Sequence, residues 1–494
     1  MKKKSLLICL ISLVCFLTPN SIFPQQMVGI PIKKQEAFVL EFKPPFDRLT
    51  VDLGDNSFTT NETTVFSISP QAVFLNNKNK PLDRTLIRPG MRVIISGNRI
   101  GEQLTASSVK VDNDVEKWKV VVNGYFESLE GDKAWIDGQS VKLLPGVTVR
   151  GTGDWKKNTF ASFNDMQLGS YVEIDGIRQT DGITCATKAE TKPNTFSDGD
   201  RKLFTAVQQN LVIPENLAGG KGKVWGREVK FSDNLELQTY VTKVGNRLIP
   251  RYQKDLPNDY PGKIVYRFFV IEDDSFNAFA LPDGSIFIHT GLLKQLKNEA
   301  QLAAVLGHEI AHAGYEHSRK KIEDPTGKWL ALAAVIAGAA TKTKEGATIG
   351  TMTALGILNS YERAAEDQAD RVGLYYMMQA GYDPREAPKV WRELSKKTKE
   401  AALNNLIYSN HSTAQQRLRN LNRVIAFNYY ETDFSQTKNG EKEYMNTVGV
   451  YFGWIPKPVV PPVRNNTPSP SVTIPKPKPT PKPTPKKPRV KKRP

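Results

Sequence analysis

The sequence predicts a multidomain chain: a mainly-β N-terminal part with two small barrel-like repeats, an α+β and mostly helical domain, and a disordered Lys/Pro-rich tail. Over residues 37–190, short runs rich in Val, Ile, Phe and Thr alternate with Gly, Asn and Asp turns. Over residues 200–430, apolar residues recur mostly at helical spacing. Residues 456–494 consist mainly of Pro, Lys, Thr and Val and cannot build a core. A chain of 494 residues is also too long for one ordinary domain.

Residues 1–26 have the pattern of an export signal. Lys2–Lys4 form a basic start, and Leu6–Leu17 form an apolar run that is too short to span a bilayer. Cleavage is expected within Asn20–Gln26, although no A-x-A pattern marks the site. An uncleaved signal anchor and a lipid attached at Cys15 remain as alternatives. The pattern predicts an exported protein, either periplasmic or secreted.

Residues 37–113 and 114–190 are predicted to be two β modules related by an internal repeat. Pro89–Arg99 aligns with Leu168–Arg178 at an offset of 79 residues, and both copies contain G-x-x-V-x-I-x-G-x-R. The repeat predicts two modules of one kind, each resembling an OB-like barrel of five or six strands. No histidine lies in either module. We therefore expect the modules to bind a substrate or a partner, or to act as spacers.

The helical domain is expected to open with two helices and a hairpin. A polar linker at Thr191–Asp200 precedes a helix at Arg201–Gln209, and a longer amphipathic helix follows at Asn234–Pro250. A strand is expected at Lys263–Val270. Beyond it, Asp283-Gly284 between two apolar runs is a hairpin signal.

The first strand of that hairpin is a candidate substrate-binding edge. An edge strand can hold an extended peptide through backbone hydrogen bonds, with little preference for side chains. The candidate residues are Asn277, Ala278, Phe279 and Ala280. Ordinary sheet structure is the alternative interpretation.

The run Ala300–His317 contains the pattern His-Glu-x-x-His at His308, Glu309 and His312. Because residues i and i+4 share a helix face, the two histidines can bind one metal ion between them. Glu309 lies beside them, where it can take a proton from a metal-bound water. The chain has only five histidines, so chance is a poor explanation. The pattern predicts a metal site on a helix.

Downstream residues can complete that site. A third ligand is needed, and Glu366 is the preferred candidate, with Glu362 as the alternative. Asp370 lies one turn after Glu366 and can accept the spare N–H of a ligand histidine. His411 and Arg417, near the end of the domain, could stabilise an anionic intermediate.

Three further helices are expected around these residues. Trp329–Ala340 and Gly346–Leu358 are apolar runs that can form a hairpin of core helices, with contact with a membrane surface or a mobile lid as the alternatives for the first. A third helix opens at Tyr382-Asp383-Pro384 and continues through Leu394. None of these runs is long enough to predict a membrane span.

The net charge of +17 is concentrated at the ends of the chain. Lys457–Pro494 carries eleven Lys and Arg residues and no acidic residue, and Lys2–Lys4 adds three more, which leaves +3 for the body. With no nucleic-acid-binding motif present, a nucleic-acid partner is not expected. The cationic tail could contact anionic envelope polymers or a membrane surface, or simply keep the protein soluble.

Together these motifs resemble the HtpX-like gluzincin metallopeptidases, the family of the CAAX prenyl endopeptidase and of periplasmic BepA-type proteases. The resemblance covers about residues 200–430. The motifs that carry it are His308-Glu309-x-x-His312, Glu366-x-x-x-Asp370, Asn277–Gly284 with Thr290–Leu293, and His411 with Arg417. It implies a zincin-type metallopeptidase domain that holds one Zn²⁺ per chain. Two departures are Ser412, where the family often has proline, and the absence of the long transmembrane helices of some branches.

The resemblance implies a role for each site residue. The implied zinc ligands are His308, His312 and Glu366. It implies that Glu309 is the general base and that Asp370 orients a ligand histidine. It implies that His411 stabilises the intermediate, or in some members approaches the metal and silences it, and that Arg417 lies near the cleft.

The resulting expectation is a periplasmic or secreted zinc metalloendopeptidase. Its substrates would be unfolded or misassembled envelope polypeptides, as in protein quality control. An envelope binding protein or chaperone with a latent metal site is the alternative. In that alternative, the β modules and the basic tail would do the main work.

Overall fold

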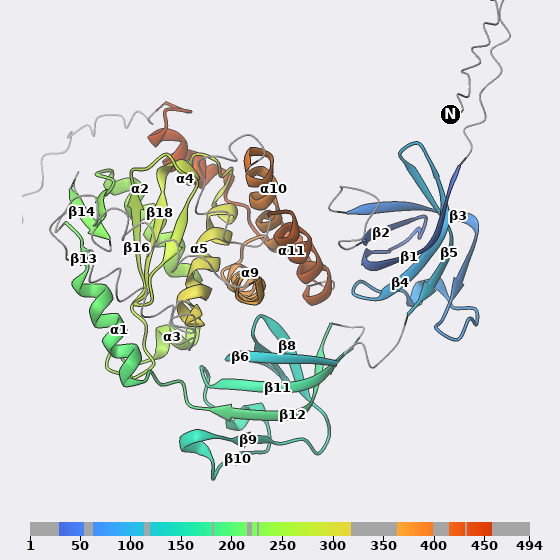
Figure 1. Ribbon diagram of the computed structural model, residues 1–494, viewed down its shortest axis with the longest axis horizontal. Helices are drawn as coiled ribbons and strands as arrows, with labels where there is room; N and C mark the ends of the chain where they lie inside the picture. Colours follow the sequence, from blue (N-terminus) through green and yellow to red (C-terminus); the bar gives the residue numbers. More distant parts are fainter. Residues whose placement is uncertain are drawn as a thin grey trace, which may run out of the picture. The chain divides into compact units, whose positions relative to one another are not determined.

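The computed structural model describes most of the chain between the predicted leader and the tail (Figure 1). The described residues are 29–53, 63–112, 119–179, 182–214, 220–224, 227–317, 363–398, 414–429 and 432–456. The residues with sequence predictions that lie outside these ranges are 1–26, 329–340, 346–358, Glu362, His411 and 457–494.

The N-terminal part begins with a closed five-stranded barrel. Its strands are β1 (Ile30–Glu41), β2 (Arg48–Asp52), β3 (Thr64–Leu75), β4 (Arg92–Ile100) and β5 (Gln103–Val111). The ring runs β1-β2-β3-β5-β4 and closes between β4 and β1, with β3 and β5 parallel. Alternate side chains point inward, so Val93 and Ile95 of β4 lie in an apolar core. The barrel starts at Ile30, before the predicted boundary at residue 37.

The second module repeats this ring of strand pairings. Its strands are β6 (Lys119–Glu130), β7 (Lys133–Ile136), β8 (Gln139–Leu143), β9 (Val149–Gly151), β10 (Thr159–Phe160), β11 (Tyr171–Arg178) and β12 (Thr184–Lys192). The ring runs β6-β7-β8-β12-β11, and β8 and β12 are parallel, as β3 and β5 are in the first barrel. The short strands β9 and β10 extend the sheet beyond β12. Both modules therefore use the same order of strands.

The sequence repeat marks matching strands of the two rings. Pro89–Arg99 includes most of β4, and Leu168–Arg178 includes β11. In chain order, each of these is the fourth strand of its ring. The shared glycine, Gly97 or Gly176, lies at a β-bulge against the fifth strand. A Cβ on Gly97 would lie 1.9 Å from the carbonyl oxygen of Thr105, so a larger residue cannot fit. Backbone packing, rather than a binding site, accounts for this part of the repeat.

Helices and two small sheets make up the remaining described residues. The helices are α1 (Asp198–Gln209), α2 (Leu235–Leu248), α3 (Arg251–Asp255), α4 (Thr290–Leu293), α5 (Glu299–Gly314), α9 (Arg363–Gln379), α10 (Ala387–Thr398), α11 (Ala414–Asn428) and α12 (Glu441–Tyr444). The strands are β13 (Leu211–Val212), β14 (Lys221–Val224), β15 (Arg227–Lys230), β16 (Arg267–Ile271), β17 (Ala278–Ala280) and β18 (Ser285–His289). The helices predicted at 201–209, 234–250 and 300–317 correspond to α1, α2 and α5.

β17 and β18 form the predicted hairpin. They pair antiparallel, and Gly284 in the turn has a φ of +88°, a left-handed conformation that favours glycine. β16 pairs parallel with β18, so β17 is an edge strand of this sheet among the described residues. The strand predicted at Lys263–Val270 begins only at Arg267. Before it, the Ile264 N–H donates to Gln253 Oε1 of α3 at 2.9 Å and does not join a strand.

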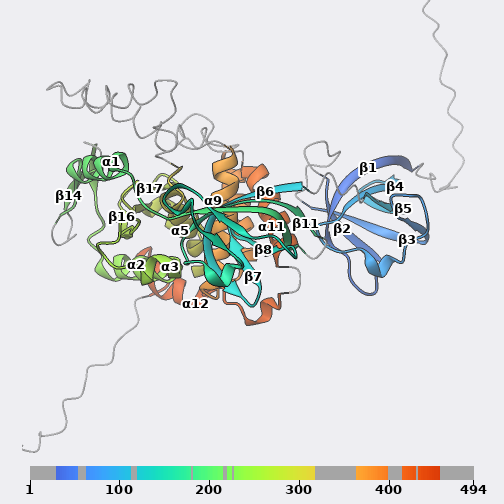
Figure 2. The same cartoon turned by 90° about the horizontal axis from the view of Figure 1, so that it is seen from below.

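α5 is the central helix of this domain. It is capped by Asn298, whose side-chain oxygen accepts the Gln301 N–H at 2.9 Å, and nearly all of its residues are buried. α9 lies beside it in both views (Figures 1 and 2). The Ala300 N–H donates to the carbonyl oxygen of Asn439 at 2.8 Å. The segment with α12 therefore packs on the first turn of α5, and the same core continues beyond the predicted end at residue 430.

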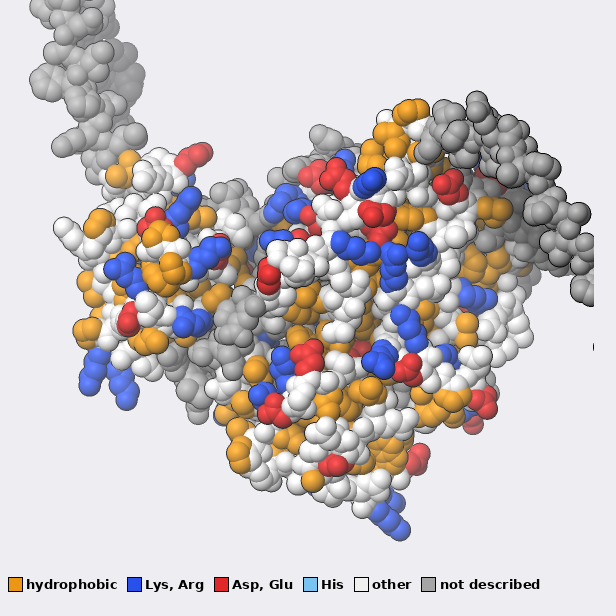
Figure 3. Space-filling view, turned by 180° about the vertical axis from the view of Figure 1, so that it is seen from behind, with side chains coloured by type: hydrophobic (Ala, Val, Ile, Leu, Met, Phe, Trp, Pro, Cys, Tyr) orange, Lys and Arg blue, Asp and Glu red, His pale blue; other side chains and the backbone are white. Residues whose placement is uncertain are grey.

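The described surface carries charges of both signs. On the face shown in Figure 3, Lys and Arg side chains are interspersed with Asp and Glu side chains. This mixture agrees with the small net charge of the chain body. Within the described ranges, none of the helices combines the length and the hydropathy needed to cross a bilayer.

The second β module shares its packing with the helical domain. Trp135 of β7 stacks on Tyr375 of α9, with ring centroids 5.1 Å apart, and on Tyr429 at 5.8 Å. Tyr125 of β6 packs edge-on against Tyr315 at 5.1 Å. These rings belong to one apolar core with α2, α5 and α9. β6 and β7 therefore pack against the helical domain and contribute to its apolar core.

A carboxyl group is buried in this shared core. Glu127 of β6 is 3% exposed, and its Oε1 accepts hydrogen bonds from the hydroxyl groups of Tyr315 at 3.2 Å and Tyr376 at 3.0 Å. Burial raises the pKa of Glu127 to about 8, against the opposing effect of the two tyrosine hydrogen bonds. The ordinary pKa of a glutamate is 4.5. Between pH 4.5 and about 8, Glu127 therefore keeps a proton in the folded protein that it has released in the unfolded chain.

Replacing Glu127 with Gln should remove this pH dependence of folding. In the wild type, the group should lower the free energy of unfolding by about 1.4 kcal/mol per pH unit through this window, because only the folded state binds the extra proton. Its stabilising effect is complete below the ordinary pKa and is lost as the pH rises through the folded pKa. Urea denaturation across the window should therefore show the Gln variant gaining stability over the wild type as the pH rises.

Glu130→Gln is the matched control for this experiment. Glu130 lies on the same strand, but its side chain is 51% exposed and forms a surface ion pair with Lys133. This variant should follow the pH dependence of the wild type. If Glu127→Gln also followed it, the buried carboxyl would not be protonated in the folded protein.

Candidate metal centre

α5 presents the residues of the His-Glu-x-x-His pattern inside the domain. His308 and His312 are one turn apart, and their Nε2 atoms face each other at 2.9 Å. His308 is 5% exposed, His312 1% and Glu309 8%, so the group is almost closed off from solvent. Two imidazole nitrogens this close can share a proton or a metal ion. The helix therefore supplies two adjacent donor atoms in a buried place.

A pair of glycines sets how closely α9 approaches α5. A Cβ on Gly373 of α9 would lie 2.9 Å from the backbone nitrogen of His308 and 3.1 Å from the carbonyl carbon of Gly307. No side chain thus separates the two helices at this crossing. Glu366 lies about two turns before Gly373 on α9 and is brought next to the two histidines.

Glu366 completes a set of three donor groups. Its Oε2 lies 3.5 Å from His308 Nε2, and its Oε1 lies 3.4 Å from His312 Nε2. The three donor atoms lie within 4.8 Å of one another, and all three side chains are buried. Neighbouring ligands on a tetrahedral zinc ion are about 3.3 Å apart for bonds of ~2.0–2.1 Å. Two nitrogens and a carboxylate oxygen at these separations fit zinc.

Asp370 and Arg417 surround the donor set with charge. Asp370 Oδ1 lies 3.0 Å from His308 Nδ1, the ring nitrogen on the far side from His312. Arg417 of α11 donates from Nε to Asp370 Oδ2 at 2.9 Å, and its Nη1 lies 3.1 Å from Glu366 Oε2. Asp370 can thus orient the ring of His308, and Arg417 binds both carboxylates.

The charges shift the pKa values of the two histidines in opposite directions. Burial and the neighbouring His308 lower the pKa of His312 well below its ordinary value. Burial and Arg417 also lower the pKa of His308, but Asp370 and Glu366 outweigh them and raise it to about 9. Burial would raise the pKa of Asp370, yet Arg417 and His308 keep it below its ordinary value. The metal-free centre thus holds its proton on His308, whereas His312 offers a neutral ring, the form that binds metals.

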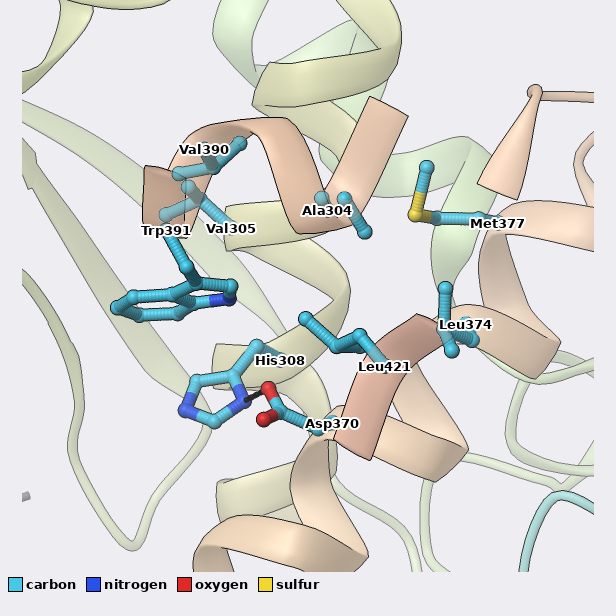
Figure 4. A pocket seen from close by; sticks show the side chains of 10 residues that line it. Ala304, Val305, His308, Asp370, Leu374, Met377, Val390, Trp391 and Leu421 are labelled. Carbon is cyan, nitrogen blue, oxygen red and sulfur yellow. Dashed lines mark ion pairs between the residues drawn. The ribbon is translucent and has the colours of Figure 1, made fainter. Parts of the chain in front are cut away.

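A narrow, mostly apolar cavity lies beside His308 (Figure 4). Its lining residues are Ala304, Val305, His308, Asp370, Leu374, Met377, Ala387, Val390, Trp391 and Leu421. In Figure 4 the ring of His308 points toward Asp370, and the indole of Trp391 lies next to it, with ring centroids 6.1 Å apart. Four helices, α5, α9, α10 and α11, meet here. The apolar surroundings lower the local dielectric constant and strengthen the bond between His308 and Asp370.

Two contacts of the centre involve residues that the sequence analysis did not select. Trp391 lies under the guanidinium of Arg417, 3.4 Å from its ring centroid. His317 Nδ1 lies 2.9 Å from His312 Nδ1. His317 could have been noticed as one of five histidines close to the pattern. Trp391 gave no such signal, because an aromatic residue in an amphipathic helix is usually a core residue.

The candidate substrate-binding residues lie on and just before β17. They are Asn277, Ala278, Phe279 and Ala280. The N–H of His289 donates to the carbonyl oxygen of Asn277, and the Leu281 N–H donates to the carbonyl oxygen of Ser285. Because antiparallel pairing alternates, the backbone groups of Ala278 and Ala280 point to the outer edge of the sheet. β17 also packs against α5, the helix that carries the two histidines.

A comparison with protein families agrees with this geometry. Residues 236–425 match the model of peptidase family M48, a range that begins in α2 and ends in α11. The chain contains an M48 peptidase domain. The three donor residues, Glu309, Asp370 and Arg417 all lie within the matched range, and both β modules precede it.

Several curated proteins are similar to part of the chain. The mitochondrial metalloendopeptidase OMA1 of Arabidopsis thaliana is 35% identical over 133 residues, which cover 27% of this chain and 26% of that protein. The beta-barrel assembly-enhancing protease of Escherichia coli (strain K12) is 29% identical over 190 residues, 37% of each chain. The mitochondrial metalloendopeptidase OMA1 of Bos taurus is 28% identical over 270 residues, 51% of this chain and 50% of that one. The chain thus spans half or less of each of these three relatives.

Replacing Gly373 with Ala should loosen the donor set of the M48 domain. The added methyl group would meet the backbone of α5, so α9 must move outward and carry Glu366 with it. We expect the zinc dissociation constant to rise roughly ten-fold or more, as when a metal site loses its support. Competition with a chelator of known affinity measures this constant. The control is Ala364→Ser, which adds one heavy atom to an exposed position on α9 and should bind zinc like the wild type. If the wild type, Gly373→Ala and Ala364→Ser all bound zinc equally, the close contact of α5 and α9 would not support the site.

Proposed function

We propose that the M48 domain is a zinc metalloendopeptidase. The observation that carries the proposal is the convergence of His308, His312 and Glu366 within 4.8 Å in a buried site, with Glu309 on the same helix as the histidines. Similarity to proteins named as proteases and metalloendopeptidases supports the same activity. One zinc ion per chain is the proposed cofactor.

The proposed ligands are His308, His312 and Glu366. When bound, zinc would polarise the scissile carbonyl and make water a stronger nucleophile near neutral pH. Glu309 is proposed as the general base, which takes a proton from the attacking water and returns it to the leaving amine. Its buried position keeps the carboxylate from being solvated, and its charge also acts on Arg417.

Asp370 and Arg417 are proposed to hold the ligands in position. Asp370 accepts the Nδ1–H of His308, which leaves the Nε2 lone pair for the metal. Arg417 binds Asp370 and Glu366 together and compensates their charge in the buried centre. His411 and Arg417 are also proposed to stabilise the anionic intermediate, because catalysis gains most where charge develops, and the resemblance implies the same role for His411. His411 lies outside the described residues.

The proposed substrate is an extended polypeptide segment. It would pair with the outward backbone groups of Ala278 and Ala280, so the outer edge of β17 would supply hydrogen bonds that do not depend on side chains. A chain recognised in this way has to be unfolded locally. Unfolded or misassembled proteins are therefore the proposed substrate class.

We further propose that the protein acts in the cell envelope. The leader pattern of residues 1–26 supports export, and one group of relatives is named for enhancing beta-barrel assembly. Other relatives are named as mitochondrial metalloendopeptidases, so the envelope location is proposed mainly on the leader pattern. The β modules and the basic tail are proposed to contact substrate, envelope polymers or a membrane surface.

Glu309→Gln should abolish cleavage and keep zinc. The variant retains the shape of the side chain but cannot accept a proton, so cleavage of casein should fall by roughly a thousand-fold or more. Zinc content, measured by elemental analysis of the purified proteins, should stay at one ion per chain. Cleavage by the variant at the wild-type rate would refute the assignment of the base.

The same measurement separates the proposal from its main competitor. If the wild type bound zinc but cleaved nothing, a binding protein or chaperone with a latent site would be favoured. If the wild type bound no zinc, the ligand assignment itself would fail. The residual activity of a contaminating protease would be the same in both proteins.

Ala278→Pro should weaken substrate binding at the proposed edge. Proline removes the outward N–H of residue 278 without touching the bonds between β17 and β18. The loss of one hydrogen bond predicts a fall in kcat/KM of roughly two- to ten-fold, seen mainly in KM. The kinetics of an extended fluorogenic peptide check this. Val265→Pro, at an exposed position before β16, is the control and should leave KM unchanged.

A further inference from the structure

The second ring nitrogen of His312 leads away from the donor set to another buried imidazole. His312 Nε2 faces His308, and His312 Nδ1 lies 2.9 Å from His317 Nδ1. His317 Nε2 in turn lies 2.9 Å from Gln368 Oε1 of α9. His317 is 5% exposed, so this contact is made out of solvent. A buried histidine therefore joins a candidate metal ligand to the neighbouring helix.

Gln368 continues the connection into the second β module. Its Nε2 donates to Asp137 Oδ1 at 2.7 Å and to the carbonyl oxygen of Asn123 at 3.0 Å. Asn123 belongs to β6, and Asp137 lies in the turn between β7 and β8. Both amide hydrogens thus have acceptors in the module, which fixes the amide with its oxygen toward His317.

The turn that carries Asp137 is held firmly against α9. Asp137 is 2% exposed, has a φ of +57° and forms an ion pair with Arg371, one turn after Gln368. The Arg371 Nε also donates to the carbonyl oxygen of Asp137 at 2.9 Å. A Cβ on the next residue, Gly138, would lie 2.6 Å from the carbonyl oxygen of Arg371. The acceptor at the end of the connection therefore has a fixed position.

These hydrogen bonds have one consistent direction. Because Gln368 Oε1 can only accept, His317 Nε2 must carry a hydrogen and donate it. A neutral His317 then has a lone pair on Nδ1, which accepts the Nδ1–H of His312. His312 in this tautomer has its own lone pair on Nε2, the atom that lies 3.4 Å from Glu366. This is the tautomer that can bind a metal at the donor set.

We propose that His317, Gln368 and Asp137 form a positioning relay that fixes the tautomer and ring orientation of His312. The inference rests on the proposed zinc site. In the relay, the β7–β8 turn of the second β module supplies the final acceptor, so the module is a supporting part of the metal centre. His308 has the direct form of the same support, because a carboxylate oxygen of Asp370 contacts its Nδ1. His308 is thus oriented by Asp370 of α9, which Arg417 of α11 holds in place, and His312 is oriented through the second β module.

Gln368→Leu tests the relay, because it removes both hydrogen-bonding ends of the amide at similar volume. The zinc dissociation constant, measured by competition with a chromophoric chelator, should rise roughly ten- to a hundred-fold. The visible absorption bands of the Co²⁺-substituted protein should also change, since they report the geometry of the ligands. The second measurement does not depend on peptidase activity.

Tyr375→Phe is the matched control. Tyr375 also lies on α9 and bonds to the second module, through a contact of 2.7 Å between its hydroxyl and Ser128 Oγ, but it does not lead to His312. It should keep the affinity and the Co²⁺ spectrum of the wild type.

His317→Leu gives a second route to the same answer. The relay is a single path, so His317→Leu combined with Gln368→Leu should weaken zinc binding no more than His317→Leu alone. If the two substitutions weakened zinc binding additively, the relay would be wrong. It would also be wrong if Gln368→Leu had the same zinc affinity and Co²⁺ spectrum as Tyr375→Phe. If the wild type itself bound no zinc, the proposed function would fail and not merely the relay. If Gln368→Leu did not fold, the zinc affinities of His317→Leu and Tyr375→Phe would be compared instead. Equal affinities would contradict the relay.

Discussion

The backbone contact between α5 and α9 is the constraint on which the metal centre depends. Helices separated by side chains usually lie about 8–10 Å apart, but Gly307 and Gly373 let these two backbones touch. At this separation the carboxylate of Glu366 lies 3.5 Å from His308 Nε2 and 3.4 Å from His312 Nε2 of the neighbouring helix. Gln368 and Arg371 of α9 also contact Asp137 in the β7–β8 turn. α9 therefore carries a candidate metal ligand and also contacts the second β module.

The centre also has an unusual balance of buried charge. In a metal-bound form, with both histidines neutral and all three carboxylates ionised, Glu309, Glu366 and Asp370 would carry three negative charges, against one positive charge on Arg417. The remaining charge of minus two matches a divalent cation. Burying ionised carboxylates without compensation is costly, so the guanidinium between Asp370 and Glu366 stabilises them whether or not metal is bound. Arginine suits this place because its planar fork bonds to two carboxylates and stacks on Trp391.

The sequence allowed good prediction where chemistry is local. The i, i+4 spacing of His308 and His312 predicted one helix face, and the β-rich repeat predicted two related modules. What it could not show were contacts between distant segments. Nothing in the pattern around Asp137 indicates that its turn meets α9, because the contact depends on the three-dimensional packing of a β module on a helix. For the same reason, the predicted end of the helical domain at residue 430 missed the segment that packs on the start of α5.

The aromatic packing of Trp135 between Tyr375 and Tyr429 has a consequence for how the protein unfolds. Elements that share a core tend to unfold as one cooperative unit. The second β module and the M48 domain should therefore form a single foldon, even though the sequence presents them as separate domains. A fragment that begins after β12 would expose the aromatic side of α9 to water. A fragment designed to contain the complete M48 domain core should accordingly begin at β6 rather than at the boundary of the family match.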